Sequence, residues 1–363
     1  MLHDTIIVRY GEIFLKSDPV RRRFEGKLIS NIEYKFQENS IPYKIITRRH
    51  RIYIDTENTK DVPEILSRVF GIVSFSPAKR TTSYLDIMSG IALNYAQDII
   101  NEGTSFSVRA NREGIHPYKS PDVEREIGAQ IKFKTGASVD LTDPDVTIFI
   151  EIRDDEAFVF HEKFPGPGGL PAGAEGRVAA LISSGIDSPA AAWMMMRRGC
   201  EVVAVHFGEV EEIYPIIEKL NRYSHSPIKI YNVKFSEIIN GEILRKINEI
   251  DSKYTCIICK RRMLSKACEI AEAENAQGLV TGDNIGQVAS QTLENLEVIS
   301  DAASLPIYRP LLCFDKEEII RLAKDIGTYS LQGKEECPFV PKHPATSGKR
   351  YVIKKIEENL GVL

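Results

Sequence analysis

The run Ser183-Ser184-Gly185-Ile186-Asp187-Ser188 places hydroxyl groups, a glycine and a carboxylate in six consecutive positions. Small residues let backbone N–H groups approach an anion closely, and a helix that begins directly after them adds the positive end of its dipole. Ser188 is a good N-cap and Pro189 a good first helical residue. The run therefore predicts a phosphate-binding turn, and a plain Ser/Gly turn that caps a helix is the simpler alternative.

This loop lies between two elements that a parallel sheet would position. Residues 178–182 are a continuous apolar run, typical of a strand buried on both faces, and residues 188–198 read as a helix. Residues 201–207 repeat the buried-strand pattern, and further strands are expected at 228–233 and 278–281. The alternation predicts a doubly wound parallel sheet, an α/β fold that binds ligands at the carboxyl ends of its strands.

The first half of the chain has short alternating strands and amphipathic helices instead. Its beginning has the order βαββαβ of a small ferredoxin-like sandwich, and a second α+β unit follows. The dense Gly and Pro of residues 164–173 can continue neither a helix nor a central strand, so we expect a connector there. The expected elements before it are strands 5–10, 43–46, 51–55, 72–75, 105–110, 146–152 and 157–160 and helices 19–39, 63–70, 86–101 and 121–134.

Length and composition are those of a soluble protein with two or three domains. Of the 363 residues, 43% are hydrophobic and 27% charged, and no apolar run approaches the about 18 residues of a membrane span. The N-terminus has no signal-peptide pattern, so a cytoplasmic protein is expected. Residues 1–60 hold 12 Lys or Arg and 8 Asp or Glu, whereas the whole chain has a net charge of −4. The excess of basic residues in residues 1–60 is consistent with an RNA-binding surface. A chance imbalance on a solvated surface explains the excess equally well.

Several stretches resemble a known family. Residues 183–188 resemble the S-G-G-x-D-S pyrophosphate loop of the PP-loop ATPases, which cleave ATP between its α and β phosphates; the P-loop string G-x-x-x-x-G-K-[ST] is absent from the sequence. Residues 281–297 read TGDNIGQVASQTLENLE, and with the loop they resemble the tRNA 4-thiouridine synthetase (tRNA uracil 4-sulfurtransferase) family. The resemblance continues in residues 8–13, 139–145 and 168–171 and covers essentially the whole chain.

The resemblance implies an ATP-dependent enzyme that adenylates O4 of a tRNA uridine, at position 8, and replaces that oxygen with sulfur to give 4-thiouridine. It implies ATP and Mg²⁺ as cofactors, tRNA and a sulfur donor (sulfide or a persulfide carrier protein) as partners, and a homodimer as one assembly to consider. Alternatives are tRNA 2-thiolation, sulfur delivery to thiamine thiazole biosynthesis and a non-catalytic RNA-binding module. The implied domains are a ferredoxin-like domain at 1–62, a THUMP RNA-binding domain at 63–165, a Gly/Pro linker at 166–175 and a PP-loop domain at 176–363.

The resemblance also implies roles for single residues. Ser184 stands where the S-G-G-x-D-S pattern has its first glycine, which would cost about 1 kcal/mol or more if that position needs a positive φ. Asp187 would hold Mg²⁺ or position a donor, and Lys260 would offset charge on the α-phosphate. Simpler readings are a core histidine at His206 and a helix-surface residue at Gln291. The implied ATP-binding residues are Leu181, Ile182, Ser183, Ser184, Gly185, Asp187, Ser188, His206, Phe207, Lys260, Gly282 and Gln291, and the implied tRNA-binding residues are Arg109, Arg112 and Lys119.

Six cysteines raise the question of the sulfur source. Cys256 and Cys259 form a C-x-x-C before an expected helix, whose positive start would lower the pKa of both thiols. With Cys337, in the segment Glu336-Cys337-Pro338-Phe339, they match cysteines that the resemblance assigns to an iron–sulfur cluster, [4Fe-4S] or [3Fe-4S], in members without a rhodanese domain. A redox dithiol with a Cys337 persulfide, and a zinc ion with His343 as fourth ligand, remain open. Cys200, Cys268 and Cys313 are expected to be buried structural thiols.

Overall fold

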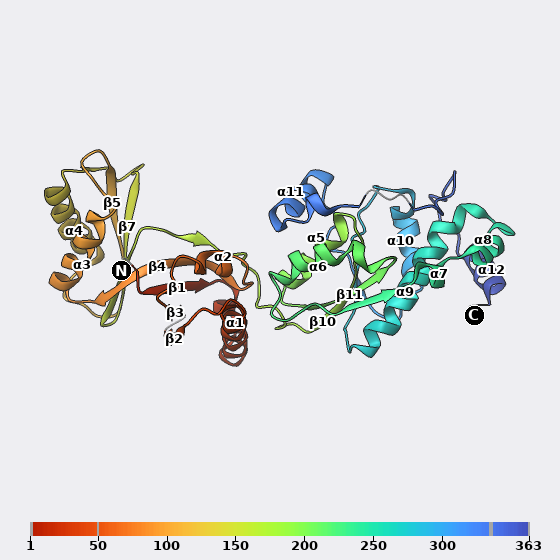
Figure 1. Ribbon diagram of the computed structural model, residues 1–363, viewed down its shortest axis with the longest axis horizontal. Helices are drawn as coiled ribbons and strands as arrows, with labels where there is room; N and C mark the ends of the chain where they lie inside the picture. The colour runs from red at the N-terminus through yellow and green to blue at the C-terminus, as the bar shows by residue number, and fades with distance from the viewer. Residues whose placement is uncertain (1–2, 49–50, 334–336, 362–363) are drawn as a thin grey trace. The chain divides into compact units, whose positions relative to one another are not determined.

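The computed structural model describes residues 3–48, 51–333 and 337–361 of the chain (Figure 1). The chain divides into two compact units, Met1–Gly169 and Leu170–Leu363. Each unit has its own sheet and its own hydrophobic core, so each can be understood from its own residues.

The first unit is built on one large, mostly antiparallel sheet. Its strand order is β2-β3-β1-β4-β8-β7-β5-β6, with β9 beside β4. The predicted order βαββαβ is confirmed over the first part, and the second α+β group follows as expected. The strands are β1 (Thr5–Tyr10), β2 (Lys44–Arg48), β3 (Arg51–Asp55), β4 (Ile72–Thr82), β5 (Ser105–Glu113), β6 (Ser138–Val139), β7 (Val146–Arg153), β8 (Glu156–Phe160) and β9 (Phe164–Pro165). The helices are the 3₁₀ turn η1 (Glu12–Leu15) and α1 (Asp18–Glu38), α2 (Val62–Leu66), α3 (Leu85–Gln97) and α4 (Ser120–Thr135).

Strand β4 joins the two halves of this sheet. It runs over 11 residues, whereas the sequence predicts only residues 72–75, and it pairs antiparallel with β1 along its first part and with β8 along its end. At the junction the rings of Tyr53 and Phe158 stack with their centroids 4.7 Å apart. The ferredoxin-like half and the half that follows therefore share one continuous strand, and the domain boundary predicted at residues 62 and 63 stays a prediction.

The Gly/Pro stretch is tied to both units by backbone hydrogen bonds. In the first unit the N–H of Gly166 donates to the carbonyl of Val73 at 2.9 Å, and the N–H of Gly168 donates to that of Ile72 at 2.8 Å. A Cβ on Gly166 would collide with the Ile72 carbonyl, so the close approach requires glycine here. In the second unit the N–H of Leu170 donates to the Arg197 carbonyl at 2.9 Å.

The second unit contains a five-stranded parallel sheet in the order β12-β11-β10-β13-β14. Strands β11 and β12 follow β10 along the chain and lie on one side of it, whereas β13 and β14 lie on its other side. The switch point therefore lies between the central strands β10 and β13. The predicted doubly wound α/β fold is confirmed, and its ligand crevice belongs at the carboxyl ends of β10 and β13. The strands are β10 (Arg177–Leu181), β11 (Glu201–Phe207), β12 (Ile230–Val233), β13 (Leu279–Val280) and β14 (Ile307–Tyr308).

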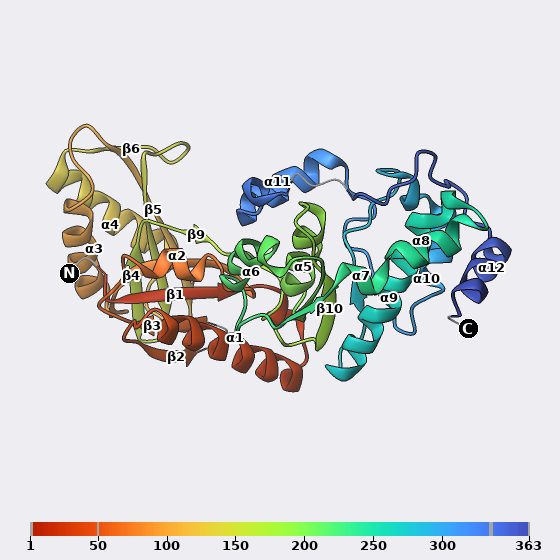
Figure 2. The same ribbon diagram turned by 45° about the vertical axis from the view of Figure 1, so that its right-hand side comes forward.

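The helices of this unit form contiguous groups around the sheet. Helix α5 contacts both α6 and α11, α9 contacts α10, and α8 lies beside α12, as Figures 1 and 2 show. The α-helices are α5 (Asp187–Arg197), α6 (Tyr214–Asn221), α7 (Phe235–Ile238), α8 (Gly241–Asn248), α9 (Thr255–Ala273), α10 (Leu293–Ser300), α11 (Lys316–Ile326) and α12 (Arg350–Leu360). The 3₁₀ turns are η2 (Val210–Glu212), η3 (Ser252–Tyr254), η4 (Ala289–Gln291) and η5 (Tyr329–Leu331).

Helix α9 presents two distinct faces. Ile257, Leu264 and Cys268 recur at helical spacing and are buried in a core that also holds Ala179 of β10 and Leu279 of β13. Positions 256, 260 and 263 follow the same spacing on a neighbouring face and are only half buried. The core contacts therefore fix the rotation of the helix about its own axis, and with it the direction in which this second face points.

Two helix starts differ from the prediction. Helix α5 begins at Asp187, so Ser188 is a helical residue and the prediction that it is the N-cap is wrong. Helix α9 begins at Thr255, so the C-x-x-C lies inside its first turns and the prediction that it precedes the helix is wrong. The reason is the preceding 3₁₀ turn η3, in which the Asp251 carboxylate accepts from the Lys253 N–H at 3.1 Å and so starts helical structure earlier.

No helix in the described part of the chain is long and apolar enough to cross a membrane.

A buried carboxylate holds together three arginines of the first unit. Glu151 of β7 is 5% exposed and lies 2.9 Å from a nitrogen of Arg9, 3.2 Å from Arg51 and 3.0 Å from Arg153. Burial and the neighbouring Arg51 lower the pKa of Arg153, which shows that these cations are crowded. The carboxylate therefore offsets the charge repulsion between the three arginine side chains, which come from β1, β3 and β7.

We expect Glu151→Ala to lower the free energy of unfolding by about 3–5 kcal/mol, because it removes a buried counter-charge from three partly buried guanidinium groups. The measurement is urea unfolding of the full chain at neutral pH. The matched control is Glu64→Ala, which removes a pair with Arg68 from a side chain that is 67% exposed and should cost less than about 1 kcal/mol. Equal losses for the two variants would contradict a structural role for Glu151.

Candidate active site

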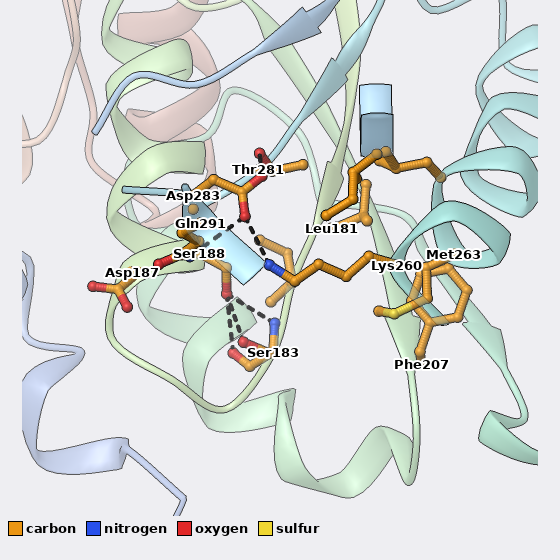
Figure 3. A pocket seen from close by; sticks show the side chains of 14 residues that line it. Leu181, Ser183, Asp187, Ser188, Phe207, Lys260, Met263, Thr281, Asp283 and Gln291 are labelled. Atoms are coloured by element: carbon orange, nitrogen blue, oxygen red, sulfur yellow. Dashed lines mark hydrogen bonds and ion pairs between the residues drawn. The ribbon is translucent and has the colours of Figure 1, made fainter. Parts of the chain in front are cut away.

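A cavity of about 260 Å³ opens at the switch point of the parallel sheet (Figure 3). Its walls come from the end of β10, the loop before α5, the end of β11, helix α9 and the segment after β13. Its lining residues are Leu181, Ile182, Ser183, Asp187, Ser188, Phe207, Lys260, Met263, Leu264, Thr281, Gly282, Asp283, Gln291 and Ile299.

The loop before α5 is closed by hydrogen bonds between its own residues. The N–H of Ser183 donates to Ser188 Oγ at 2.8 Å, the two hydroxyl oxygens lie 3.0 Å apart, and the N–H of Gly185 donates to Ser183 Oγ at 3.4 Å. A Cβ on Gly282 would come within 2.7 Å of the Ser188 nitrogen, so β13 ends directly against the loop only because residue 282 is glycine. The loop is thus held in shape from within and from behind.

Ser184 carries no backbone strain. Among the described non-glycine residues only Ser40, Asp154 and Asn275 have a positive φ, so the cost foreseen for a serine at position 184 does not arise. Ser184 accepts a hydrogen bond from the Gly333 N–H at 2.9 Å through its carbonyl.

Asp283 is the polar centre of the cavity floor. Its carboxylate accepts from Lys260 Nζ at 3.0 Å, from Arg309 Nε at 3.3 Å and from the Thr281 hydroxyl at 2.8 Å. Burial alone would raise the pKa of Asp283, but Lys260, the Thr281 hydrogen bond and Arg309 together bring the pKa below its usual value. In Figure 3 the Lys260 side chain extends through the cavity to reach this carboxylate.

The rest of the cavity divides into a charged mouth and an apolar slot. At the mouth, Lys316 of α11 donates from Nζ to Asp187 Oδ1 at 2.9 Å, and Gln287 Oε1 lies 3.5 Å from the same nitrogen. In Figure 3 Phe207 and Met263 lie side by side at another part of the cavity, away from Ser183 and Asp187. A phosphate-type loop flanked by lysines and an apolar slot suit a nucleotide, whose phosphates and base need these two environments.

The structure brings together nine of the twelve residues implied for ATP. Ser184, Gly185 and His206 are outside the cavity lining. His206 is 3% exposed, and its ring nitrogens lie 2.8 Å from the Ile182 carbonyl and 3.1 Å from the Glu209 carbonyl, which is the arrangement of a core histidine. Gln291 is buried, not on a helix surface; its Nε2 donates to Asp283 at 3.4 Å, and its Oε1 has no hydrogen-bond partner among the described residues. That oxygen is a buried, unsatisfied acceptor in a residue that lines the cavity.

Sequence reasoning missed several residues of this site. Asp283 stands in the quoted string TGDNIGQVASQTLENLE, and its position next to Gly282 at a strand end was a usable signal. Arg309 and Lys316 come from segments far along the chain, and only the fold shows that they approach Asp283 and Asp187. The missed residues are Met263, Leu264, Thr281, Asp283 and Ile299 in the lining and Arg309 and Lys316 beside it.

Three cysteines lie near this cavity. Cys256 and Cys259 occupy the first turns of α9 and are half buried, and Cys337 is exposed in the loop that follows the undescribed residues; Glu336, quoted with it, lies outside the described residues. Burial, then the charge of Cys337, raises the pKa of both helical thiols, that of Cys259 to about 12. The prediction that the helix start lowers these pKa values is wrong, because burial outweighs the dipole. The effect of Cys337 on both thiols shows that the three sulfurs are neighbours.

The described residues contain no group of three or more His, Cys, Asp or Glu arranged to hold a metal ion. The zinc alternative, with His343 as fourth ligand, therefore stays a prediction. In a cluster each thiolate binds a different iron, so three neighbouring thiols suit that group by their chemistry, and the cluster stays a prediction. Cys200 and Cys268 are buried as expected, but Cys313 is exposed, because the apolar run that contains it is a turn after β14.

The basic residues implied for RNA lie in the first unit. Arg109 and Arg112 are three positions apart on the regular strand β5, so their side chains leave opposite faces of the sheet. Arg112 Nη1 donates to the Gly114 carbonyl at 2.8 Å, and Lys119 precedes α4 as its N-cap. Beside Arg112 and Lys119 is a cavity of about 790 Å³ whose lining includes Tyr84, His116 and Tyr118. Its aromatic rings form a surface on which unpaired bases could stack.

Comparison with known proteins identifies this arrangement. Residues 173–362 match the family model described as "Thiamine biosynthesis protein (ThiI)", residues 5–76 match the ThiI ferredoxin-like domain and residues 85–162 match the THUMP domain. The chain belongs to the ThiI family. This ThiI-family chain is 41% identical over 371 residues to a Methanocaldococcus jannaschii protein named "Probable tRNA sulfurtransferase", covering 98% of this chain and 97% of that protein.

Two further relatives extend the comparison. A Methanobrevibacter smithii protein with the same name is 40% identical over 376 residues, covering 99% of this chain and 95% of that protein. Among solved structures, a 4-thiouridine synthetase in complex with RNA and bound ATP is similar to this ThiI-family chain, with a TM-score of 0.88, 31% identity and coverage of 99% and 95% of the two chains. The similarity therefore includes both units.

We expect Asp283→Asn to lower the free energy of unfolding by about 3 kcal/mol, because Lys260 and Arg309 lose a buried counter-charge. In a double-mutant cycle with Lys260→Met, the double variant should lose at least about 1 kcal/mol less stability than the sum of the two single losses. The control is Asp301→Asn, whose carboxylate pairs with Arg350 at the surface and should cost under about 1 kcal/mol. Additive costs at positions 260 and 283 would contradict the ion cluster.

We expect iodoacetamide at pH 8 to label the exposed Cys313 and Cys337 well before Cys259, with the order read by mass spectrometry of digests. The thiolate is the reactive form, and a pKa of about 12 leaves Cys259 almost fully protonated at pH 8. The labelling rate of Cys259 should therefore still increase as the pH rises from 10 to 11, where an ordinary thiol with a pKa of about 8.5 has nearly levelled off. Early labelling of Cys259 at pH 8 would refute this environment.

Proposed function

We propose that this protein is an ATP-dependent tRNA sulfurtransferase that converts a tRNA uridine, position 8 by resemblance, to 4-thiouridine. The observation that carries the proposal is the switch-point cavity, which combines the loop Ser183–Ser188, Lys260 and an apolar slot, with Lys316 paired to Asp187 beside it. The similarity to a 4-thiouridine synthetase that binds ATP and RNA supports the specific product. The relatives named as tRNA sulfurtransferases support the reaction class.

The chemistry has two displacement steps. The uridine O4 attacks the α-phosphorus of ATP, the bond from that phosphorus to the bridging oxygen breaks, and pyrophosphate leaves. A sulfur nucleophile then adds to C4, the C4–O4 bond breaks, and AMP leaves with the former O4. The first step makes a poor leaving group into a good one, so the protein must mainly position the reactants and stabilise phosphate charge.

The cavity residues can meet these needs. The backbone of the loop Ser183–Ser188 and the N-terminus of α5 would bind the pyrophosphate, with Lys316 beside it. Lys260 would leave Asp283 for the α-phosphate, since its side chain is long and 31% exposed. Asp187 would hold Mg²⁺, which supplies charge neutralisation on the phosphates when bound. The base would enter the slot lined by Phe207 and Met263.

The three cysteines would serve the second step of the reaction, the transfer of sulfur. Cys256, Cys259 and Cys337 would hold the iron–sulfur cluster, which supplies an iron with a free position that can bind sulfur. Cys256 lies one helical turn from Lys260, so the sulfur side and the nucleotide side of the reaction share one face of α9. The high pKa values of the free thiols argue against a relay through free Cys256 or Cys259 thiolates.

The first unit would bind the tRNA. Arg112, Lys119 and the aromatic cavity with Tyr84 and His116 offer phosphate contacts and a stacking surface on one side of the THUMP region. Arg109, on the opposite face of β5, would contact a different part of the RNA. The contribution of these residues is affinity and orientation, separate from the chemistry.

Anaerobically prepared protein incubated with unmodified tRNA, Mg-ATP and sulfide should thiolate the tRNA, as measured by retardation on a mercury-containing gel. We expect Asp187→Ala to lower turnover by at least about 100-fold while the Kd for tRNA stays within about twofold, because the site of the lost carboxylate is the phosphate loop. Asp301→Ala is the control for loss of a carboxylate and should retain turnover. A non-catalytic RNA-binding module would behave identically with and without Asp187.

A further inference from the structure

A second cavity lies beside the segments that carry Cys256 and Cys337. It has a volume of about 480 Å³ and is lined by the end of α8, the turn η3, the first residue of α9 and the loop after Cys337. Thr255 and Pro338 both line it, and their chain neighbours are Cys256 and Cys337. The segments that carry the cysteines are therefore also walls of this cavity.

The cavity is basic. Its lining includes Lys253, Lys342 and His343, and no Asp or Glu is among the described residues that line it. The first turn of α9, a helix of 19 residues, also faces it through Thr255 and adds the positive end of the helix dipole. Fields from several cations add in a concave site, so an anion would be concentrated here.

The walls are rigid. The loop Cys337–Ala345 contains three prolines, at 338, 341 and 344, which limit its backbone freedom. Phe339 stacks on Phe235 with ring centroids 5.7 Å apart, and the N–H of Ala345 donates to the Lys253 carbonyl at 3.0 Å. The cavity is thus a preformed feature and does not depend on movement of the loop.

We propose that this cavity, bounded by Lys253, Lys342 and His343, is the entry site for the sulfur donor and binds it as a small anion that ends in a negatively charged sulfur. The ligand assignment rests on the proposed function, since the reaction needs a sulfur nucleophile at the cysteines. Hydrosulfide and the persulfide anion of a small thiol share this chemistry.

A first test needs neither ATP nor tRNA. Full-length protein with free thiols is labelled by iodoacetate, an anion, and by iodoacetamide, its neutral analogue, and the rates at Cys256 and Cys337 are compared by mass spectrometry. The ratio of the two rates cancels the thiolate fraction and reports the local potential. We expect this ratio to fall at least about fivefold at low salt in K253E/K342E, and the difference to shrink at high salt.

The matched control is K44E/K134E, which makes the same change in net charge at two exposed lysines of the other unit and should leave the ratio unchanged. An unchanged ratio in K253E/K342E, or an equal fall in the control, would overturn the anion site. This outcome is independent of the proposed enzyme activity, so the two proposals can fail separately.

A second test identifies the ligand. In tRNA thiolation, K253E/K342E should raise the KM for sodium sulfide at least about fivefold, with the KM for ATP and the Kd for tRNA unchanged. The same variant is assayed with cysteine persulfide as donor; a KM shift confined to one donor would assign the site to that source. An unchanged KM with both donors would overturn the proposal. A rise in the Kd for tRNA as large as the rise in the KM for sulfide would also overturn it, because the lysines would then contact RNA phosphates.

Discussion

The ion cluster of Asp283 with Lys260 and Arg309 is the interaction on which the second unit's cavity depends. A carboxylate this deeply buried is unfavourable unless cations and hydrogen bonds compensate it. Its partners come from α9 and from the segment after β14, while Asp283 itself follows β13. One polar contact therefore connects three elements at the point where the sheet reverses its winding. It also leaves Lys260 at the edge of the cluster, where its ammonium can be shared with a ligand.

Helix α9 connects the separate tasks of the proposed reaction. One of its faces is buried in the core between β10 and β13, and the neighbouring face carries Cys256, Lys260 and Met263 in consecutive turns. Because the helix is fixed by its core contacts, the spacing from thiol to ammonium to base slot is fixed by helical geometry alone. A loop could not have held these three groups with the same accuracy.

Much of the fold follows from the sequence, because burial periodicity gives the parallel sheet and the βαββαβ order directly. The loop before α5 was also predictable, since a strand, small residues and a helix follow one another. Asp283 was harder to assign, because a carboxylate beside phosphates makes sense only with Lys260 and Arg309 in view. Lys316 comes from α11, far along the chain, and has no local signal. The exposure of Cys313 and the high pKa values of the α9 thiols depend on tertiary burial, which neither a motif nor a helix dipole determines.

Strand β4 has a consequence for substrate choice. An extended strand of 11 residues spans about 36 Å, and this one belongs to both halves of the first unit's sheet. A shared strand cannot bend like a linker, so the ferredoxin-like half and the THUMP half keep a constant separation. A surface with two contact regions at a fixed distance acts as a ruler. In the proposed function it would select RNA by the length and shape of its folded form and would need to read few bases to do so.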